Sequence, residues 1–232
     1  MTRRRTLLSI ERSVIRCTRC PELRAYIADV GIEKKRAHRD CDYWAKPVPG
    51  FGDPRARVMI VGLAPGAHGS NRTGRPFTGD ASGDFLYPVL YRTGFASQPN
   101  SVDRNDGMQL HDCFISAALR CAPPQNKPMP RELRNCFSYL VEEFFALERT
   151  RVAVALGSIA FTALLSLFRE AGFALEPARP AFGHGSEFTA TKGSRRVQAI
   201  ASYHPSRQNT NTGVLTVGMF EAIFKRAREL VE

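Results

Sequence analysis

Two side chains in the sequence have the chemistry of catalytic groups and stand where a loop would present them. Asp80 follows a glycine-rich stretch, and its carboxylate could position a water molecule or stabilise a positive charge. His204 follows an apolar segment, and Pro205 restricts the chain after it, so its ring could donate a hydrogen bond or transfer a proton. Each also has an ordinary structural alternative: Asp80 could cap a helix that starts near Ala81, and a lone histidine is more often structural.

Other loop residues have the chemistry to bind a base or a phosphate. The segment 62–69 reads GLAPGAHG, and its small residues let a backbone approach a ligand closely. It lacks the ending of a Walker loop and the spacing of a dinucleotide fingerprint, and by itself it could be a tight turn. Phe77 lies between turn residues, outside any apolar face, and could stack on a base. Phosphate contacts are expected from the run of donors that follows His204, namely Arg207, Gln208 and Asn209.

The six cysteines are too sparse for a disulfide scaffold, and four of them are grouped. Cys17 and Cys20 form a C-x-x-C pair, and Cys121 and Cys136 are separated by a longer segment. Four thiolates without a nearby histidine fit a [4Fe–4S] cluster at least as well as a zinc ion, and four buried free thiols are the remaining alternative. Cys41 and Cys113 have no partner by spacing, and we expect them to be core residues or bystanders.

The charge of the chain narrows the class of partner. There are 33 Lys and Arg against 22 Asp and Glu, which gives a formal net charge of +11. An excess of positive charge favours a polyanionic partner such as nucleic acid, although a soluble protein with a basic surface and no such partner could have the same net charge. With 43% hydrophobic and 24% charged residues, the composition excludes a disordered or fibrous chain. No apolar run approaches the ~20 residues that span a bilayer, and the basic start lacks an apolar core of secretory length, so we expect a cytoplasmic protein without membrane contact.

These residues must be positioned by alternating strands and helices. Apolar patterns predict strands over 57–63, 111–119, 151–156, 187–191 and 196–202, and helices over 7–16, 84–91, 131–147, 157–169 and 215–231. Residues 25–42 show no apolar period. The alternation predicts an α/β fold with a mostly parallel sheet, in which ligands bind at the carboxyl ends of the strands. The length of 232 residues predicts a single domain.

Four motifs in this order resemble those of the iron–sulfur uracil-DNA glycosylases, most closely family five, or type B. They are GLAPG at 62–66, GRPFTGDASG at 74–83, RCAPPQNKP at 120–128 and HPS at 204–206. The resemblance implies a three-layer α/β/α fold with a central four-stranded parallel sheet. It also implies a [4Fe–4S] cluster held by Cys17, Cys20, Cys121 and Cys136, which would tie the N-terminal segment into a single domain, 1–232.

The activity implied by this resemblance is monofunctional: uracil is flipped out of DNA and its N-glycosidic bond is hydrolysed, leaving an abasic site for base excision repair. We expect Asp80 to orient water and stabilise the cationic sugar, and His204 to donate a hydrogen bond to uracil O2. The base would be bound by Gly62, Ala64, Pro65, Gly66, Phe77 and Asn126, and the DNA by Ser206, Arg207, Gln208 and Asn209. Arg75, Arg120 and Arg207 would supply positive charge near the strand ends. We expect a monomer, associated with the nucleoid through DNA that contains uracil or another deaminated base.

The chain departs from the related family-four pattern at two positions. Leu63 stands where family four has an acidic residue, and Ala117 where it has a uracil-reading asparagine. A preference for other damaged bases, such as hypoxanthine or ethenocytosine, is therefore an alternative. A non-catalytic iron–sulfur DNA-binding module and a zinc-stabilised α/β protein with another ligand are further alternatives, but the first would not need Asp80 and His204 at loop ends.

Overall fold

The residues of β2 (Val58–Gly62) show why the sheet lies at the centre of the molecule. In the computed structural model, which describes residues 5–232, Val58 and Ile60 point to one face and Met59 and Val61 to the other. All four are completely buried, so both faces of the strand need a cover of helices. The basic start of the chain, residues 1–4, lies outside the described residues.

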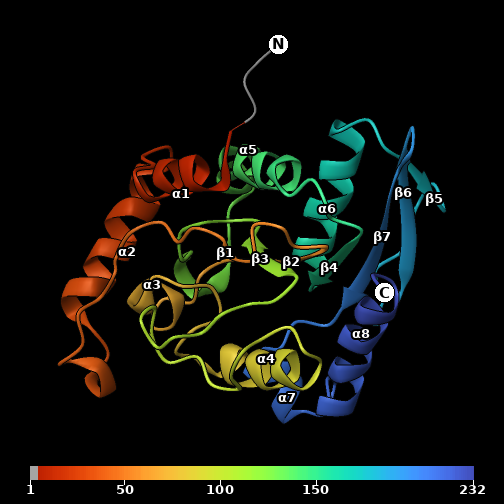
Figure 1. Ribbon diagram of the computed structural model, residues 1–232. Helices are drawn as coiled ribbons and strands as arrows, with labels where there is room; N and C mark the ends of the chain where they lie inside the picture. Colours follow the sequence, from red (N-terminus) through yellow and green to blue (C-terminus); the bar gives the residue numbers. More distant parts are fainter. Residues whose placement is uncertain (1–4) are drawn as a thin grey trace.

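The sheet has a parallel centre and antiparallel edges (Figure 1). Its order is β1-β3-β2-β4-β7-β6-β5, with β1 Phe51–Gly52, β3 Cys113–Ala117, β4 Val152–Leu156, β7 Arg195–Ser202, β6 Glu187–Lys192 and β5 Ala174–Glu176. The four strands β3, β2, β4 and β7 are parallel, with Val58 paired to Cys113 on one side and Val152 on the other. The predicted four-stranded parallel sheet is therefore confirmed as the centre of a larger, seven-stranded mixed sheet. The sequence did not predict β1 and β5, because strands of two and three residues are too short to show an apolar pattern.

Two pairs of helices cover the two faces and complete the three layers (Figure 1). On the side of Val58 lie α4 (Ala81–Arg92) and α8 (Val217–Glu229), the latter through the buried Phe220. On the side of Met59 lie α5 (Pro130–Ala146) and α6 (Ser158–Glu170). Each completely buried apolar side chain contributes about 1.5–3 kcal/mol to this packing.

The N-terminal part forms two helices, of which sequence patterning indicates only the first. α1 (Leu7–Ile15) packs against α5. α2 (Pro21–Glu33) occupies a stretch for which we predicted no helix. Proline is compatible with the first position of a helix, and the buried Leu23, Ile27 and Val30 recur at helical spacing. Short turns complete the chain, namely η1 (Arg36–His38), α3 (Ser70–Thr73), η2 (Pro124–Asn126) and α7 (Arg207–Asn211). None of the helices within 5–232 has the length and apolar character to traverse a bilayer.

Candidate active site

The loops after β2, β3 and β7 meet around one pocket of about 820 Å³ at the carboxyl ends of the strands. Most residues that the sequence analysis selected for catalysis or binding line it, namely Gly62, Ala64, Pro65, Gly66, Phe77, Asp80, Asn126, His204, Ser206, Arg207 and Gln208. Asn209 does not: its side-chain amide donates to the His204 carbonyl at 2.9 Å. The structure therefore places Asn209 behind the pocket, where it holds the backbone of the histidine.

Asp80 is both the cap of α4 and part of the pocket wall. Its Oδ1 accepts hydrogen bonds from the backbone N–H groups of Ser82 and Gly83, at 3.1 and 3.2 Å, so the predicted capping role is confirmed. Within residues 5–232 no donor reaches Oδ2, which lies over Gly66 and Gly69; a Cβ at Gly69 would be 2.0 Å from it. Burial raises the pKa of Asp80, and the two amide donors oppose the rise. One oxygen is thus fixed to the helix while the other is left for a ligand.

His204 projects into the pocket from the loop after β7. Its carbonyl accepts from the Ser206 N–H at 2.8 Å as well as from Asn209. Gly157, with φ +96°, makes room beside it, since a Cβ there would lie 3.2 Å from the His204 Cβ. Burial lowers the pKa of His204 to about 4. The imidazole is therefore neutral at pH 7, and it can donate a hydrogen bond without carrying a charge.

Phe77 forms an aromatic wall next to His204, with ring centroids 6.0 Å apart and planes 31° from parallel. Its φ of +51° is the left-handed region, which ordinary residues rarely adopt and which often marks functional sites. Two glycines make this position possible. A Cβ at Gly83 would lie 1.8 Å from the Phe77 carbonyl oxygen, and one at Gly62 would lie 2.8 Å from the ring.

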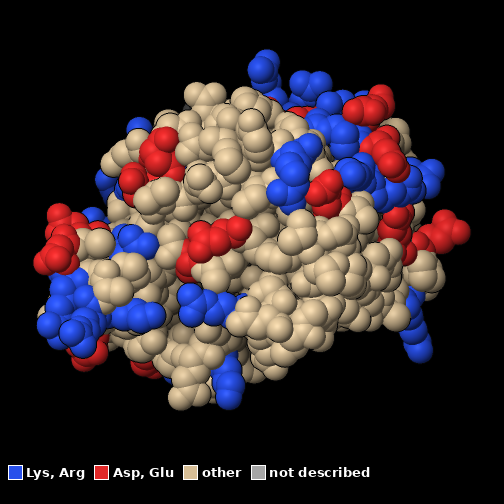
Figure 2. All heavy atoms as spheres, turned by 90° about the horizontal axis from the view of Figure 1, so that it is seen from below, with Lys and Arg blue, Asp and Glu red and all other residues tan. Residues whose placement is uncertain are grey.

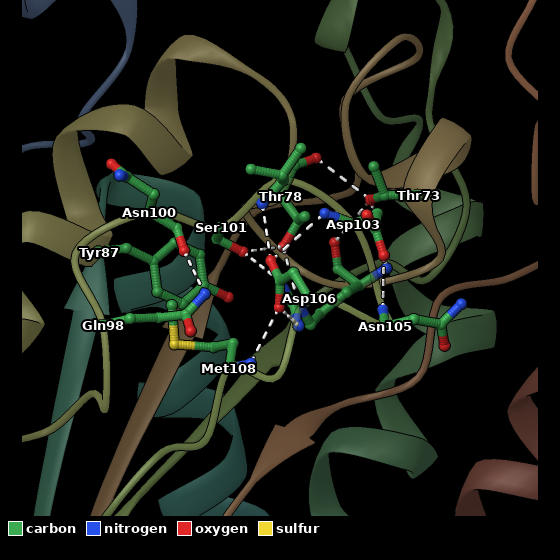
Figure 3. Close-up of polar contacts among 12 residues, drawn as sticks. Thr73, Thr78, Tyr87, Gln98, Asn100, Ser101, Asp103, Asn105, Asp106 and Met108 are labelled. Atoms are coloured by element: carbon green, nitrogen blue, oxygen red, sulfur yellow. Dashed lines mark hydrogen bonds and ion pairs between the residues drawn. The ribbon is translucent and has the colours of Figure 1, made fainter.

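A buried polar network supports the loop that carries Phe77 and Asp80 (Figure 3). Arg75, only 3% exposed, pairs with Asp106 at 2.5 Å and also donates to Thr78 and Ser101. Burial opposes ionisation of Asp106, but the hydrogen bonds from Arg75 and from backbone N–H groups outweigh it and hold the pKa at about 2. Removing one partner from such a buried pair costs about 3–5 kcal/mol, so the network fixes the loop strongly.

Two of the three arginines expected to supply positive charge near the strand ends are paired with buried or partly buried carboxylates. Arg75 is paired as described, and Arg120, 1% exposed, pairs with Glu143 at 2.6 Å and donates to Ser116. Arg120 does line the pocket near the strand ends, as expected, but in both arginines the charge is balanced by a carboxylate from a distant part of the chain. Arg207 is exposed at the rim of the pocket and remains available.

The four grouped cysteines approach one another between α2 and α5. Cys20, Cys121 and Cys136 pack in one apolar cluster, and charges on Cys17 and Cys20 would act on the other two. Burial raises the pKa of Cys121 to about 12 and that of Cys136 to about 11. Within residues 5–232, no three His, Cys, Asp or Glu side chains are gathered closely enough to bind one metal ion together. Cys113, by contrast, is buried in the main core.

Several groups around these thiols suit an anionic ligand. The Asn135 side chain donates to the Cys20 sulfur at 3.4 Å, and the Arg120 backbone N–H donates to the Cys136 sulfur. Arg24 acts electrostatically on Cys121, and its buried Nη1 has no hydrogen-bond partner within 5–232. The donor set and this unpaired cation fit a tetrathiolate cluster with net negative charge.

Comparison with known proteins now assigns the family. Residues 49–228 match the model of the uracil DNA glycosylase superfamily. The chain belongs to this superfamily. It is 50% identical over 214 residues to the type-5 uracil-DNA glycosylase of Thermus thermophilus, covering 92% of this chain and 93% of that protein. The type-5 uracil-DNA glycosylase of Pyrobaculum aerophilum is 44% identical over 214 residues, 92% and 88% of the two chains. A type-4 uracil-DNA glycosylase of Archaeoglobus fulgidus is 32% identical over 160 residues, 68% and 70% of the two chains.

Leu63 and Ala117, the two departures from the type-4 pattern, both line the uracil-DNA glycosylase pocket and bring no polar side chain to it. Other lining residues were not selected from the sequence. Lys35, His38 and His68 line the pocket as well. His68 stands in the GLAPGAHG segment and could have been found there, whereas Lys35 and His38 lie in a charged stretch without any pattern.

Proposed function

We propose that this chain is a uracil-DNA glycosylase of the type-5 kind, which hydrolyses the N-glycosidic bond of uracil in DNA and leaves an abasic site for base excision repair. The observation that carries the proposal is the placement of the free Asp80 Oδ2 and a neutral His204 in one pocket beside the Phe77 ring. We further infer that the protein acts as a monomer and associates with the nucleoid through its substrate.

The reaction needs help at both ends of the breaking bond. After the base leaves the duplex, at a cost of a few kcal/mol, Phe77 offers a stacking surface for it. As the C1′–N1 bond breaks, its electron pair goes to uracil, and the neutral His204 ring donates to O2 where negative charge develops. The sugar becomes oxocarbenium-like, and the Asp80 carboxylate stabilises it and orients the water that adds to C1′.

The apolar side chains on the wall of the pocket favour damaged bases other than uracil as a second class of substrate. Leu63 and Ala117 are apolar, and the two side-chain amides that line the pocket nearby, Gln125 and Asn126, are both exposed on η2 with positive φ. No amide projects from the end of β3 to select uracil alone. Hypoxanthine and ethenocytosine are therefore candidate substrates of the same site.

The test is a glycosylase assay on matched duplexes that contain uracil, hypoxanthine, ethenocytosine or thymine, with abasic sites revealed by alkaline cleavage. We expect cleavage at uracil, with weaker cleavage at the other damaged bases and none at thymine. Tight DNA binding without any abasic product would contradict the proposal and favour a non-catalytic DNA-binding module.

We further propose that Cys17, Cys20, Cys121 and Cys136 hold a [4Fe–4S] cluster that fastens the N-terminal helices to the rest of a single domain, 1–232. When bound, the cluster supplies a structural cross-link. Four thiolates that each bind a different iron do not need to converge on one point, unlike the ligands of a single zinc ion. The Asn135 and Arg120 N–H groups would hydrogen-bond to the sulfurs, and Arg24 would offset the negative charge.

Purified protein is expected to be brown, with broad visible absorption and about four irons and four sulfides per chain. Cys121→Ser should lose both colour and iron, whereas Cys41→Ser, at a position outside the group, should keep them. Colourless protein with one equivalent of zinc would rule out the cluster.

A further inference from the structure

A group of basic side chains lies on the wall of the pocket opposite to α7. Lys35 and His38 come from the turn after α2, and His68 from the loop after β2; all three line the pocket. In Figure 1 the end of α2 and the turn after it lie at the left of the molecule, well separated from α7. Figure 2 shows a group of Lys and Arg side chains at this left side, with Asp and Glu side chains among them.

These groups have no anionic partner in the described part of the chain. No ion pair formed within residues 5–232 includes Lys35, His38 or His68. Burial, followed by the charges of Lys35 and Arg72, lowers the pKa of His68, and burial with Arg72 and Lys35 lowers that of His38. The basic groups are thus close enough to repel one another, and a bound anion would relieve this repulsion.

His68 is held in a fixed orientation. Its Nδ1 is 3.0 Å from the Tyr43 hydroxyl, and the two rings meet edge to face. Its carbonyl oxygen accepts from the Arg72 Nε at 2.9 Å, and Arg72 also donates to the Gly79 carbonyl next to Asp80. When Tyr43 donates to Nδ1, the proton of the neutral ring is on Nε2, so the free edge of the ring is a donor.

We propose that Lys35, His38 and His68 form a phosphate-binding subsite for the DNA strand that carries the damaged base. Together with Ser206, Arg207 and Gln208 on the other wall, this basic wall would hold the backbone on both sides of the flipped nucleotide. Contacts to phosphates fix the register of a protein on DNA without reading its sequence. The inference rests on the proposed function, because it takes damaged DNA as the ligand of the pocket.

The first experiment measures binding to a duplex that carries a stable abasic-site analogue, by fluorescence anisotropy over a range of salt concentrations. Lys35→Ala/His68→Ala is expected to bind more weakly and to lower the slope of log K against log salt by about 1, the value for one lost phosphate contact. Arg36→Ala is the matched control, because this exposed arginine belongs to the same turn but does not line the pocket. It should keep the wild-type slope.

The second experiment replaces single phosphates around the abasic analogue by uncharged methylphosphonates. In the wild type, replacements on both sides of the site should weaken binding, and in Lys35→Ala/His68→Ala the replacement on one side should have no further effect. An unchanged salt slope together with full sensitivity at every position in the variant would overturn the subsite. Uracil excision is measured in parallel, so that failure of the subsite is distinguishable from failure of the glycosylase function, which would be lost in the wild type as well.

Discussion

Replacement of Asp80 by asparagine is expected to lower the single-turnover rate of uracil excision by about 10²–10⁴-fold, the usual contribution of a positioned acid or base. The amide oxygen of asparagine can still accept from Ser82 and Gly83, so α4 keeps its cap, but no negative charge remains for water or the sugar cation. Binding to a duplex with an abasic analogue should be retained. The measurement is single-turnover excision from a uracil duplex, with anisotropy for the affinity.

Two further variants separate the roles of this carboxylate. Asp80→Ala should lose the same activity and, in addition, about 0.5–2 kcal/mol of stability with the cap. Asp84→Asn, an exposed carboxylate on the first turn of α4, should change neither. Because burial raises the pKa of Asp80 above 3.8, the wild-type rate should begin to fall at a higher pH than for an ordinary carboxyl as the solution is acidified. A wild-type rate in Asp80→Asn would remove this residue from the mechanism.

Replacement of His204 by alanine is expected to lower the rate by about 10²–10³-fold, as for the loss of one donor to a developing oxyanion. The affinity for the abasic analogue should change much less, because the hydrogen bond gains its strength only as charge appears on the base. His204→Gln retains an N–H donor and should recover part of the lost rate. If His204→Ala weakened binding and left the rate of the bound complex intact, the proposed O2 donor would be wrong.

The protonation state of this histidine gives an independent test. Burial lowers its pKa to about 4, so the ring is neutral throughout the range from about pH 5 to 8 and its charge does not change there. His204 should therefore contribute no limb to the pH profile of the bound complex across this range, and the acid limb expected from Asp80 should persist in His204→Ala. A limb that disappeared in His204→Ala would indicate a charged imidazole instead.

The centre of the fold was predictable because its residues are buried on both faces. The run from Val58 to Gly62 has no polar position, and such a strand belongs in the middle of a parallel sheet. α2 was not predictable in the same way: its apolar residues recur at helical spacing, but the opposite face is mixed and Pro21 stands at its start. This helix is stabilised by packing against parts of the protein that are distant in the sequence.

The residues of the site also fall into those that local sequence could predict and those that depend on long-range contacts. Asp80 and His204 stand directly at the ends of predicted elements, so position and residue type sufficed to select them. The pairing of Arg75 with Asp106, 31 residues away, and of Arg120 with Glu143, 23 residues away, follows no local period. Lys35 reaches the pocket only because α2 turns the chain toward it.

The close contacts around Phe77 determine which changes this loop can accept. At Gly83 even a methyl group would occupy the volume of the Phe77 carbonyl, and at Gly62 it would displace the ring. These positions are closed to other residues by excluded volume, whatever reaction the pocket performs. Several glycines of this sequence motif are therefore required for steric reasons. A match to the motif indicates the conformation of the loop more directly than it indicates the reaction.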